Sequence, residues 1–169
     1  TEAMEVMAPV PGRMQVVNGG SKWPRVVVDY AHTPDAVEKA LAALRPQCRG
    51  ELICVVGCGG DRDRGKRAQM GLAAAKGSDR AWFTSDNPRS EDPERILDDM
   101  SRSLGGHKLE RVRSEVNRAR AIAAALASAC PDDVVLIAGK GHEQTQEING
   151  QFLPFSDFAV VHEIQSENS

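Results

Sequence analysis

The sequence predicts an α/β protein with a Rossmann-like, mostly parallel sheet that carries helices on both faces. Strand-like apolar runs alternate five times with segments of helical spacing, the pattern of a sheet built from βα units. Two of these runs, 52–56 and 134–138, are apolar throughout, which is typical of strands buried on both faces. Aromatic residues make up only 4% of the chain, so we expect an aliphatic core.

The first unit consists of a strand at 26–28 and a helix over 34–44. In that helix, apolar residues follow the spacing i, i+3, i+4, i+7 of a buried helical face: Val37, Ala40, Leu41 and Leu44. Thr33 is placed to cap the helix, and Pro34 suits its first turn.

Two further units follow. The strand at 52–56 precedes a helix over 67–75 that Gly77 should end, and the strand at 81–84 precedes a helix that starts at Asp92. This helix should present its apolar residues to the core.

The last part of the chain contains a weaker strand at 109–112, an Ala-rich helix over 115–129 and the strand at 134–138. A hairpin turn is predicted at 149–150 because Asn-Gly favours the tight turns of hairpins. A short helix over 158–165 should close the fold.

Composition fits one domain of 169 residues, and several classes of protein are disfavoured. The net charge of −3 includes no basic stripe, which argues against a nucleic-acid partner. The longest apolar runs have about five residues, far short of a membrane span. Residues 1–5 are acidic and lack the apolar core of a signal peptide, so we expect a cytoplasmic protein, and a monomer.

The four cysteines do not have the spacing of a metal site. Cys54 and Cys58 lack the usual two-residue separation, and no second close pair accompanies them. We therefore expect no metal site, and reduced, mostly buried thiols instead.

Polar residues cluster in the four loops that follow strands. In parallel sheets, ligands bind beyond the carboxyl ends of the strands. The loops at 29–34, 57–67, 86–89 and 139–143 should therefore share one ligand-binding edge.

The loop at 57–67 has the spacing of a phosphate-binding loop from Gly60 to Lys66. Arg67 stands where a magnesium-binding Ser or Thr is needed, however, and Asp61 and Asp63 place carboxylates where phosphate would lie. A salt-bridged loop that presents an arginine to a carboxylate ligand is the better interpretation. The alternative is a solvated charged turn.

The loop Asp86-Asn87-Pro88-Arg89 suits a zwitterion, because its carboxylate can pair with an ammonium group and its guanidinium can bind a carboxylate. Pro88 would make the loop rigid. The alternative is a plain turn before the helix at Asp92.

Two histidines follow strands as well. His32 either contacts a nucleotide or phosphate, or is simply a histidine at a helix start. His142-Glu143 lacks the second histidine of a zinc hydrolase motif.

Five segments in the same order resemble the C-terminal domain of the Mur ligases, closely those that add meso-diaminopimelate. They are Val10–Met14, Asp29–Asp35, Gly57–Arg67, Asp86–Arg89 and Ala138–Glu143. The resemblance implies that 1–20 is a linker from a missing ATPase domain and that 21–169 is the C-terminal domain.

The resemblance also implies a reaction. ATP would phosphorylate the carboxylate of UDP-MurNAc-L-Ala-D-Glu, and the amine of meso-diaminopimelate would attack the acyl phosphate to form an amide of the peptidoglycan precursor. The implied diaminopimelate-binding set is Arg62, Asp86, Asn87, Pro88, Arg89, Gly139 and Glu143. The implied ATP contacts are Arg13, Asp29 and His32.

The family's phosphate loop, magnesium ligands and modified lysine have no match in this sequence. We therefore expect a fragment that is inactive alone, contains no catalytic residue, and leaves ATP and Mg²⁺ mainly to the missing central domain. One alternative is a non-catalytic amino-acid-binding domain. Another is a Mur- or folylpolyglutamate-type ligase adding a different residue, and Arg89 argues against it because those relatives lack this loop.

Overall fold

The computed structural model describes residues 10–168 and contains a six-stranded sheet of order β1-β2-β6-β3-β4-β5. The strands are β1 (Gln15–Val17), β2 (Arg25–Asp29), β3 (Leu52–Cys58), β4 (Arg80–Ser85), β5 (Val112–Ser114) and β6 (Val134–Ala138). The edge strand β1 is antiparallel to β2, and all other neighbours are parallel. The order places β6 at the centre, between β2 and β3.

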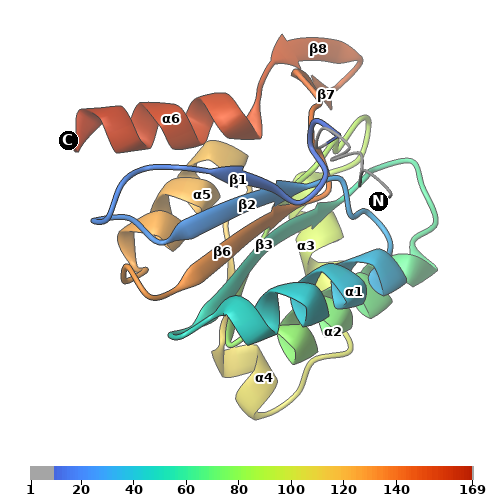
Figure 1. Ribbon diagram of the computed structural model, residues 1–169. Coiled ribbons are helices and arrows are strands. Elements are labelled where there is room, and N and C mark those ends of the chain that lie inside the picture. Colours follow the sequence, from blue (N-terminus) through green and yellow to red (C-terminus); the bar gives the residue numbers. More distant parts are fainter. Residues whose placement is uncertain (1–9, 169) are drawn as a thin grey trace, which may run out of the picture.

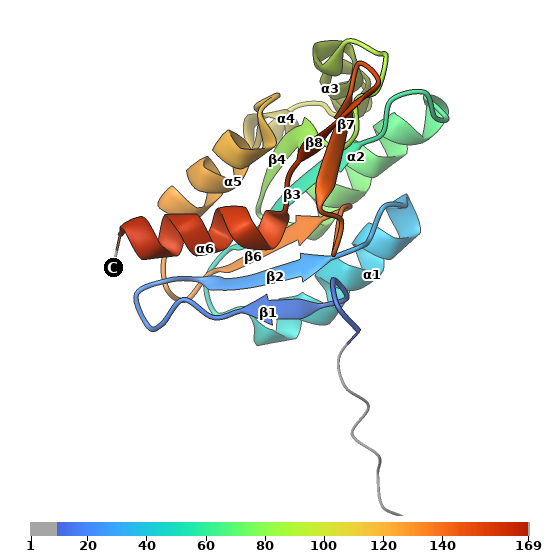
Figure 2. The same cartoon turned by 90° about the horizontal axis from the view of Figure 1, so that it is seen from above.

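Helices cover both faces of the sheet (Figures 1 and 2). They are α1 (Pro34–Leu44), α2 (Gly65–Gly77), α3 (Pro93–Ser101), α4 (His107–Glu110), α5 (Arg118–Ala127) and α6 (Asp157–Glu167), with a 3-10 turn at Arg45–Gln47. One apolar core joins the sheet to α1, α2 and α3, and a second joins it to α5 and α6. Neighbouring strand residues alternate between the cores: Cys54 lies in the first and Val55 in the second. The predicted fold class is confirmed.

Local signals explain where the helices begin. The Thr33 hydroxyl accepts a hydrogen bond from Ala36 N at 3.2 Å, and the Asp92 carboxylate accepts one from Glu94 N at 3.0 Å. The α2 helix begins at Gly65, two residues earlier than predicted, and ends at Gly77 as predicted.

Two short elements differ from the prediction. The segment predicted as a strand at 109–112 forms the end of the helix α4 and the start of the strand β5. The predicted strand and β5 share only Val112. Val112 is buried, whereas Leu109 is half exposed and adds no strand-like alternation. The edge strand β1 was not predicted because it has three residues, of which only Val17 is buried. It lies in the segment assigned to the linker, of which residues 1–9 are outside the described part.

A two-stranded hairpin, β7 (Thr145–Ile148) and β8 (Gln151–Pro154), stands apart from the sheet next to its carboxyl edge (Figure 1). Its turn lies at Asn149-Gly150 as predicted, with positive φ angles of 50° and 74°.

Two expectations from composition can be compared with the described residues. Of the four cysteines, all free, only Cys54 is buried, so the prediction of mostly buried thiols is wrong. Over residues 10–168, no helix has the length and apolar character needed to cross a membrane.

Candidate functional site

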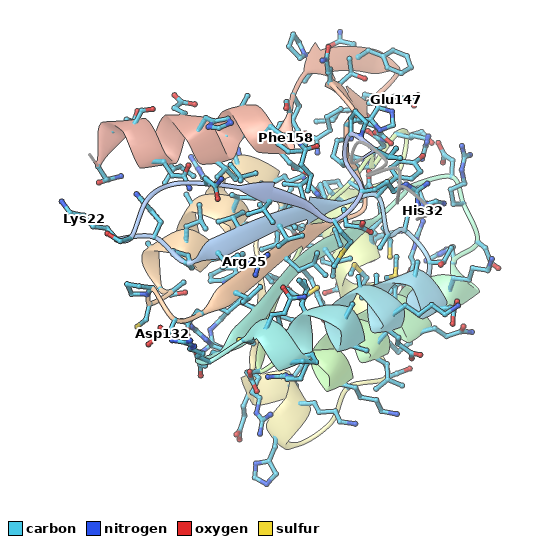
Figure 3. The ribbon with its side chains drawn as sticks, viewed as in Figure 1. Lys22, Arg25, His32, Asp132, Glu147 and Phe158 are labelled. Atoms are coloured by element: carbon cyan, nitrogen blue, oxygen red, sulfur yellow. The ribbon has the colours of Figure 1, made fainter. Side chains whose placement is uncertain are left out.

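A cleft of about 430 Å³ opens at the carboxyl edge of the sheet, and all four polar loops contribute to its walls. The predicted binding residues in these walls are His32, Arg62, Asp86, Asn87, Arg89, Gly139 and Glu143. Figure 3 shows His32 and Glu147 at this end of the molecule and Lys22 and Asp132 at the opposite end. The four loops that were predicted to share one edge of the sheet therefore line one cleft.

Lys140 organises the acidic side of the cleft, a role that was not predicted from the sequence. Its side chain is fully buried, and Nζ lies 2.9 Å from Glu143 Oε2, 3.1 Å from Asn87 Oδ1 and 3.6 Å from Asp86 Oδ1. A buried ammonium needs paired acceptors, and these three groups supply them. Only the position of Lys140 just after β6 could have pointed to it.

Asp86 follows β4 and is 9% exposed. Burial raises the pKa of Asp86, and the positive charges of Arg118 and Lys140 oppose this rise. Gly139 packs against this carboxylate with φ +114°, and a Cβ there would lie 3.0 Å from Asp86 Oδ2. A side chain at position 139 would therefore be strained and would crowd Asp86.

The hairpin holds the backbone of the loop at 86–89. Gln146 Nε2 donates to Asp86 O at 2.7 Å, and Glu147 N donates to Asn87 Oδ1 at 2.9 Å. Arg89 N donates to Glu147 O at 3.0 Å, and Asn149 N donates to Arg89 O at 2.8 Å. These bonds hold Arg89 at a φ of +54°, which a non-glycine residue rarely adopts.

The Arg89 guanidinium lies across the cleft wall, with its side chain 20% exposed. Nη1 donates to Gly60 O at 2.9 Å and to Asn87 O at 3.5 Å, and Nε lies 3.2 Å from Glu147 Oε2. Within residues 10–168 both side-chain hydrogen bonds of the guanidinium use Nη1, and its ion pair with Glu147 uses Nε.

Pro88 is an exception in the predicted set. It is buried behind the wall, outside the cleft lining, and its carbonyl oxygen would lie 1.8 Å from a Cβ added to Gly60. Pro88 therefore packs the loops at 57–67 and 86–89 together.

The loop at 57–67 is salt-bridged, as predicted. Asp61 accepts a hydrogen bond from Ser90 Oγ at 2.7 Å, while the buried Arg67 pairs with Glu91 and lies 3.1 Å from Asp99 Oδ2. Arg62 is exposed at the cleft, where its Nη1 donates to Asp61 O at 3.1 Å. Both arginines line the cleft, Arg62 as an exposed side chain and Arg67 as one that is paired within the protein.

Of the three predicted ATP contacts, only His32 lines the cleft. Arg13 lies 5.2 Å from the centre of the Tyr30 ring, and Tyr30 is also a lining residue. Asp29 is buried and accepts hydrogen bonds from Met14 N at 2.7 Å and Ala31 N at 2.8 Å. Asp29 therefore fixes the turn that carries Arg13 next to the cleft.

Comparison with known proteins identifies the family. The model for "Mur ligase, glutamate ligase domain" matches residues 12–141. The UDP-N-acetylmuramoyl-L-alanyl-D-glutamate–2,6-diaminopimelate ligase of Coxiella burnetii is 55% identical over 148 residues, which are 88% of this chain and 30% of that protein.

Two solved structures are similar in fold. That of a UDP-N-acetylmuramoyl-L-alanyl-D-glutamate–2,6-diaminopimelate ligase has a TM-score of 0.87 and 44% identity, covering 96% of this chain and 33% of its own. Escherichia coli FolC in complex with ADP has a TM-score of 0.59 and 25% identity, covering 96% of this chain and 32% of its own.

The chain spans about a third of the length of these relatives. The family model matches residues 12–141, which are most of the chain. The matched region contains the loops that follow β2, β3 and β4 and the start of the loop that follows β6, and all four loops line the cleft. The chain therefore belongs to the Mur ligase family, in the region that the glutamate ligase domain model describes.

Proposed function

We propose that this chain is the C-terminal, amino-acid-binding domain of a ligase that joins meso-diaminopimelate to UDP-MurNAc-L-Ala-D-Glu in peptidoglycan synthesis. The observation that carries this proposal is the division of charge in the cleft. Arg62 and Arg89 lie in its walls together with the carboxylates of Asp86 and Glu143. The names of the relatives at about 55% identity support the same substrate.

The distal end of diaminopimelate bears one ammonium and one carboxylate group, and the cleft offers a partner for each. The guanidinium of Arg89 can bind the carboxylate, and Asp86 and Glu143 can accept from the ammonium group. Holding the distal end directs the other amine out of the cleft. That amine would then meet the activated carboxylate at a fixed geometry, which lowers the entropic cost of the reaction.

ATP would be bound mainly outside this chain, with Arg13 and His32 reaching it from the edge of the cleft and Asp29 holding the Arg13 turn. The nucleotide complex of FolC supports ATP use in a related fold. Among residues 10–168 there is no group of three side chains suited to a metal ion, so we assign no magnesium ligand here.

We further propose that 1–20 is a linker and 21–169 the domain, part of a cytoplasmic enzyme, and that the chain alone forms no amide bonds. Sequencing the gene upstream tests this part. A Gly-Lys-Thr or Gly-Lys-Ser phosphate loop is expected there, and its absence would favour a non-catalytic amino-acid-binding protein.

Arg89→Ala in the full-length enzyme tests the substrate role. Losing one partner of a charge-assisted pair costs roughly 2–5 kcal/mol, so the KM for diaminopimelate should rise by on the order of 30-fold or more. The KM for ATP should change little. Steady-state kinetics with each substrate varied in turn gives both values.

Arg95→Ala is the matched control, because Arg95 is an exposed arginine of α3 outside the cleft lining. This variant should keep both KM values. An unchanged diaminopimelate KM in Arg89→Ala would remove Arg89 from substrate binding and with it the main support for the proposal.

A further inference from the structure

We propose that Arg118, held by Asp157, is a positioning residue that fixes the ends of β4 and β6 and thereby aligns the substrate-binding groups of the two following loops. This inference rests on the proposed function and extends it to a buried ion pair outside the cleft. Neither residue lines the cleft, and both side chains are 0% exposed.

The contacts of Arg118 join four elements at the carboxyl edge of the sheet. Arg118 is the first residue of α5, and Asp157 is the first residue of α6. Nε and Nη2 of Arg118 donate to the two oxygens of Asp157 at 2.8 and 2.9 Å. The guanidinium is thus bidentate to the Asp157 carboxylate, a contact that fixes the relative orientation of the two groups.

The remaining bonds of Arg118 reach the last residue of each of two strands. Nη1 donates to Ser85 O at 3.3 Å, and Nη2 donates to Ala138 O at 3.1 Å. Asp86 and Gly139, both in the cleft wall, come directly after these residues. One planar group therefore joins the points where the two loops begin, in addition to the pairing of both strands with β3.

The sheet does not fix the end of β4 on both sides. Pairing between β4 and β5 stops at Phe83, opposite Ser114, so Ser85 lies beyond that ladder. Arg118 supplies a donor to the Ser85 carbonyl where β5 supplies none. Loosening this contact would let the Asp86 loop shift relative to the Gly139 loop.

Packing alone does not explain a charged pair at this place. Burying both ions has a high desolvation cost, and apolar residues of similar volume often replace such pairs without loss of stability. A cation in the first turn of α5 also opposes the dipole of that helix. An apolar side chain at position 118 could not form hydrogen bonds with the two strand ends, and it could not place a positive charge near Asp86.

Electrostatics give the same pair a second effect on the cleft. Burial raises the pKa of Asp86, and the charge of Arg118 opposes that rise. The negative charges of Glu143 and Asp157 also raise it, but Asp157 acts more weakly than Arg118, so the loss of both members of the ion pair should raise the pKa of Asp86 further. Ionised Asp86 pairs with the ammonium group of the substrate, so binding should then weaken at a higher pH than in the parent.

The double variant Arg118→Met/Asp157→Leu in the full-length enzyme separates positioning from stability. It removes both charges together and leaves an apolar pair of similar size. Arg80→Met/Glu51→Leu is the matched control, because it removes a partly exposed ion pair, 2.7 Å between Nε and Oε2, at the opposite end of β4.

Three readouts are expected to move in the Arg118 double variant. The KM for diaminopimelate should rise at least tenfold while the KM for ATP stays within about twofold. The acid limb of kcat/KM for diaminopimelate should move to higher pH. Amide hydrogen exchange should accelerate at 86–89 and 139–141, with a melting temperature close to that of the parent.

The proposal would be overturned by a folded double variant in which the KM for diaminopimelate, the acid limb of kcat/KM and the amide exchange rates all equal those of the parent. The ion pair would then be a purely structural contact. If the double variant does not fold, Arg118→Lys decides the matter. Lysine keeps the charge but has three donors on a single atom, so it cannot reproduce the four hydrogen bonds of Arg118. A raised diaminopimelate KM therefore supports positioning, and a parental value refutes it.

Failure of the proposed function can be distinguished from failure of this inference. If the parent enzyme does not use diaminopimelate, the proposed function is wrong whatever the variants do. The exchange measurement at 86–89 and 139–141 needs no substrate and still tests whether Arg118 holds the two loops.

Discussion

The Asn87 amide shows how one buried charge can set the chemistry of a neighbour. Its Oδ1 accepts hydrogen bonds from Lys140 Nζ at 3.1 Å and from Glu147 N at 2.9 Å. Its Nδ2 therefore turns toward Glu143 Oε2, at 3.4 Å. Lys140 fixes which end of the amide faces the Glu143 side of the cleft, and it offsets the repulsion between Asp86 and Glu143.

Lys140→Met should destabilise the fold and weaken substrate binding together. Breaking a buried ion pair by removing one partner costs about 3 kcal/mol, because the carboxylates remain. The pKa of Asp86 is already raised by burial, so protonation at low pH should relieve this cost. The loss in free energy of unfolding should therefore shrink as the pH falls, as denaturant unfolding at several pH values would show.

Lys39→Met is the control for this prediction, because Lys39 forms only an exposed pair with Asp35 at 2.8 Å. Such a pair contributes little to stability. Equal losses in both variants, or a loss for Lys140→Met that does not depend on pH, would contradict the role assigned to Lys140.

Site residues can be predicted from the sequence when they lie directly after a predicted strand. Asp86, Arg89, Gly139 and Glu143 follow strands, and the structure gathers them in one cleft. Arg118 could not be predicted as buried, because a charged residue at the start of an Ala-rich helix has the pattern of a solvated surface. Its partner Asp157 is 39 residues away, and no local pattern records that contact.

At the scale of elements, the hairpin β7–β8 supports the loop at 86–89. Its first strand and turn form hydrogen bonds with the backbone of Asp86 and Arg89 and with the side chain of Asn87. The second strand, β8, is exposed along its whole length. Side chains of β7 should therefore matter to the loop, whereas those of β8 should not.

Gln146→Ala tests this division. The Asp86 carbonyl would lose its buried donor, a change worth about 1–3 kcal/mol, and amide exchange at 86–89 should accelerate. Gln151→Ala, on the exposed strand of the same hairpin, is the control and should leave exchange unchanged. Equal exchange in the two variants would show that the hairpin does not support the loop.

Length and burial decide which elements could be predicted. The buried strands β3 and β6 have seven and five residues, and their apolar runs are unambiguous. The strands β1 and β5 have three residues each, with one buried residue in each, so no period can emerge. The place of β5 is fixed by pairing with β4, which is distant in sequence, whereas β1 pairs with the next strand along the chain.

At the scale of the whole molecule, we propose that the cleft is one wall of a larger site. The chain spans about a third of the length of its relatives. The charged groups of its cleft suit recognition of an amino acid more than activation of a carboxylate. In such an enzyme, closure of domains would complete the site and exclude water. Specificity for the amino acid would then reside in this chain, while the energy of the reaction would come from ATP bound elsewhere.

The most direct test of this account compares meso-diaminopimelate with L-lysine as substrates of the full-length enzyme. Lysine keeps the distal ammonium but lacks the distal carboxylate, so Arg89 would be left without its partner. We expect kcat/KM for lysine to be lower by on the order of 30-fold to several thousand-fold, the equivalent of roughly 2–5 kcal/mol. Equal use of both amino acids would contradict a cleft that recognises two opposite charges.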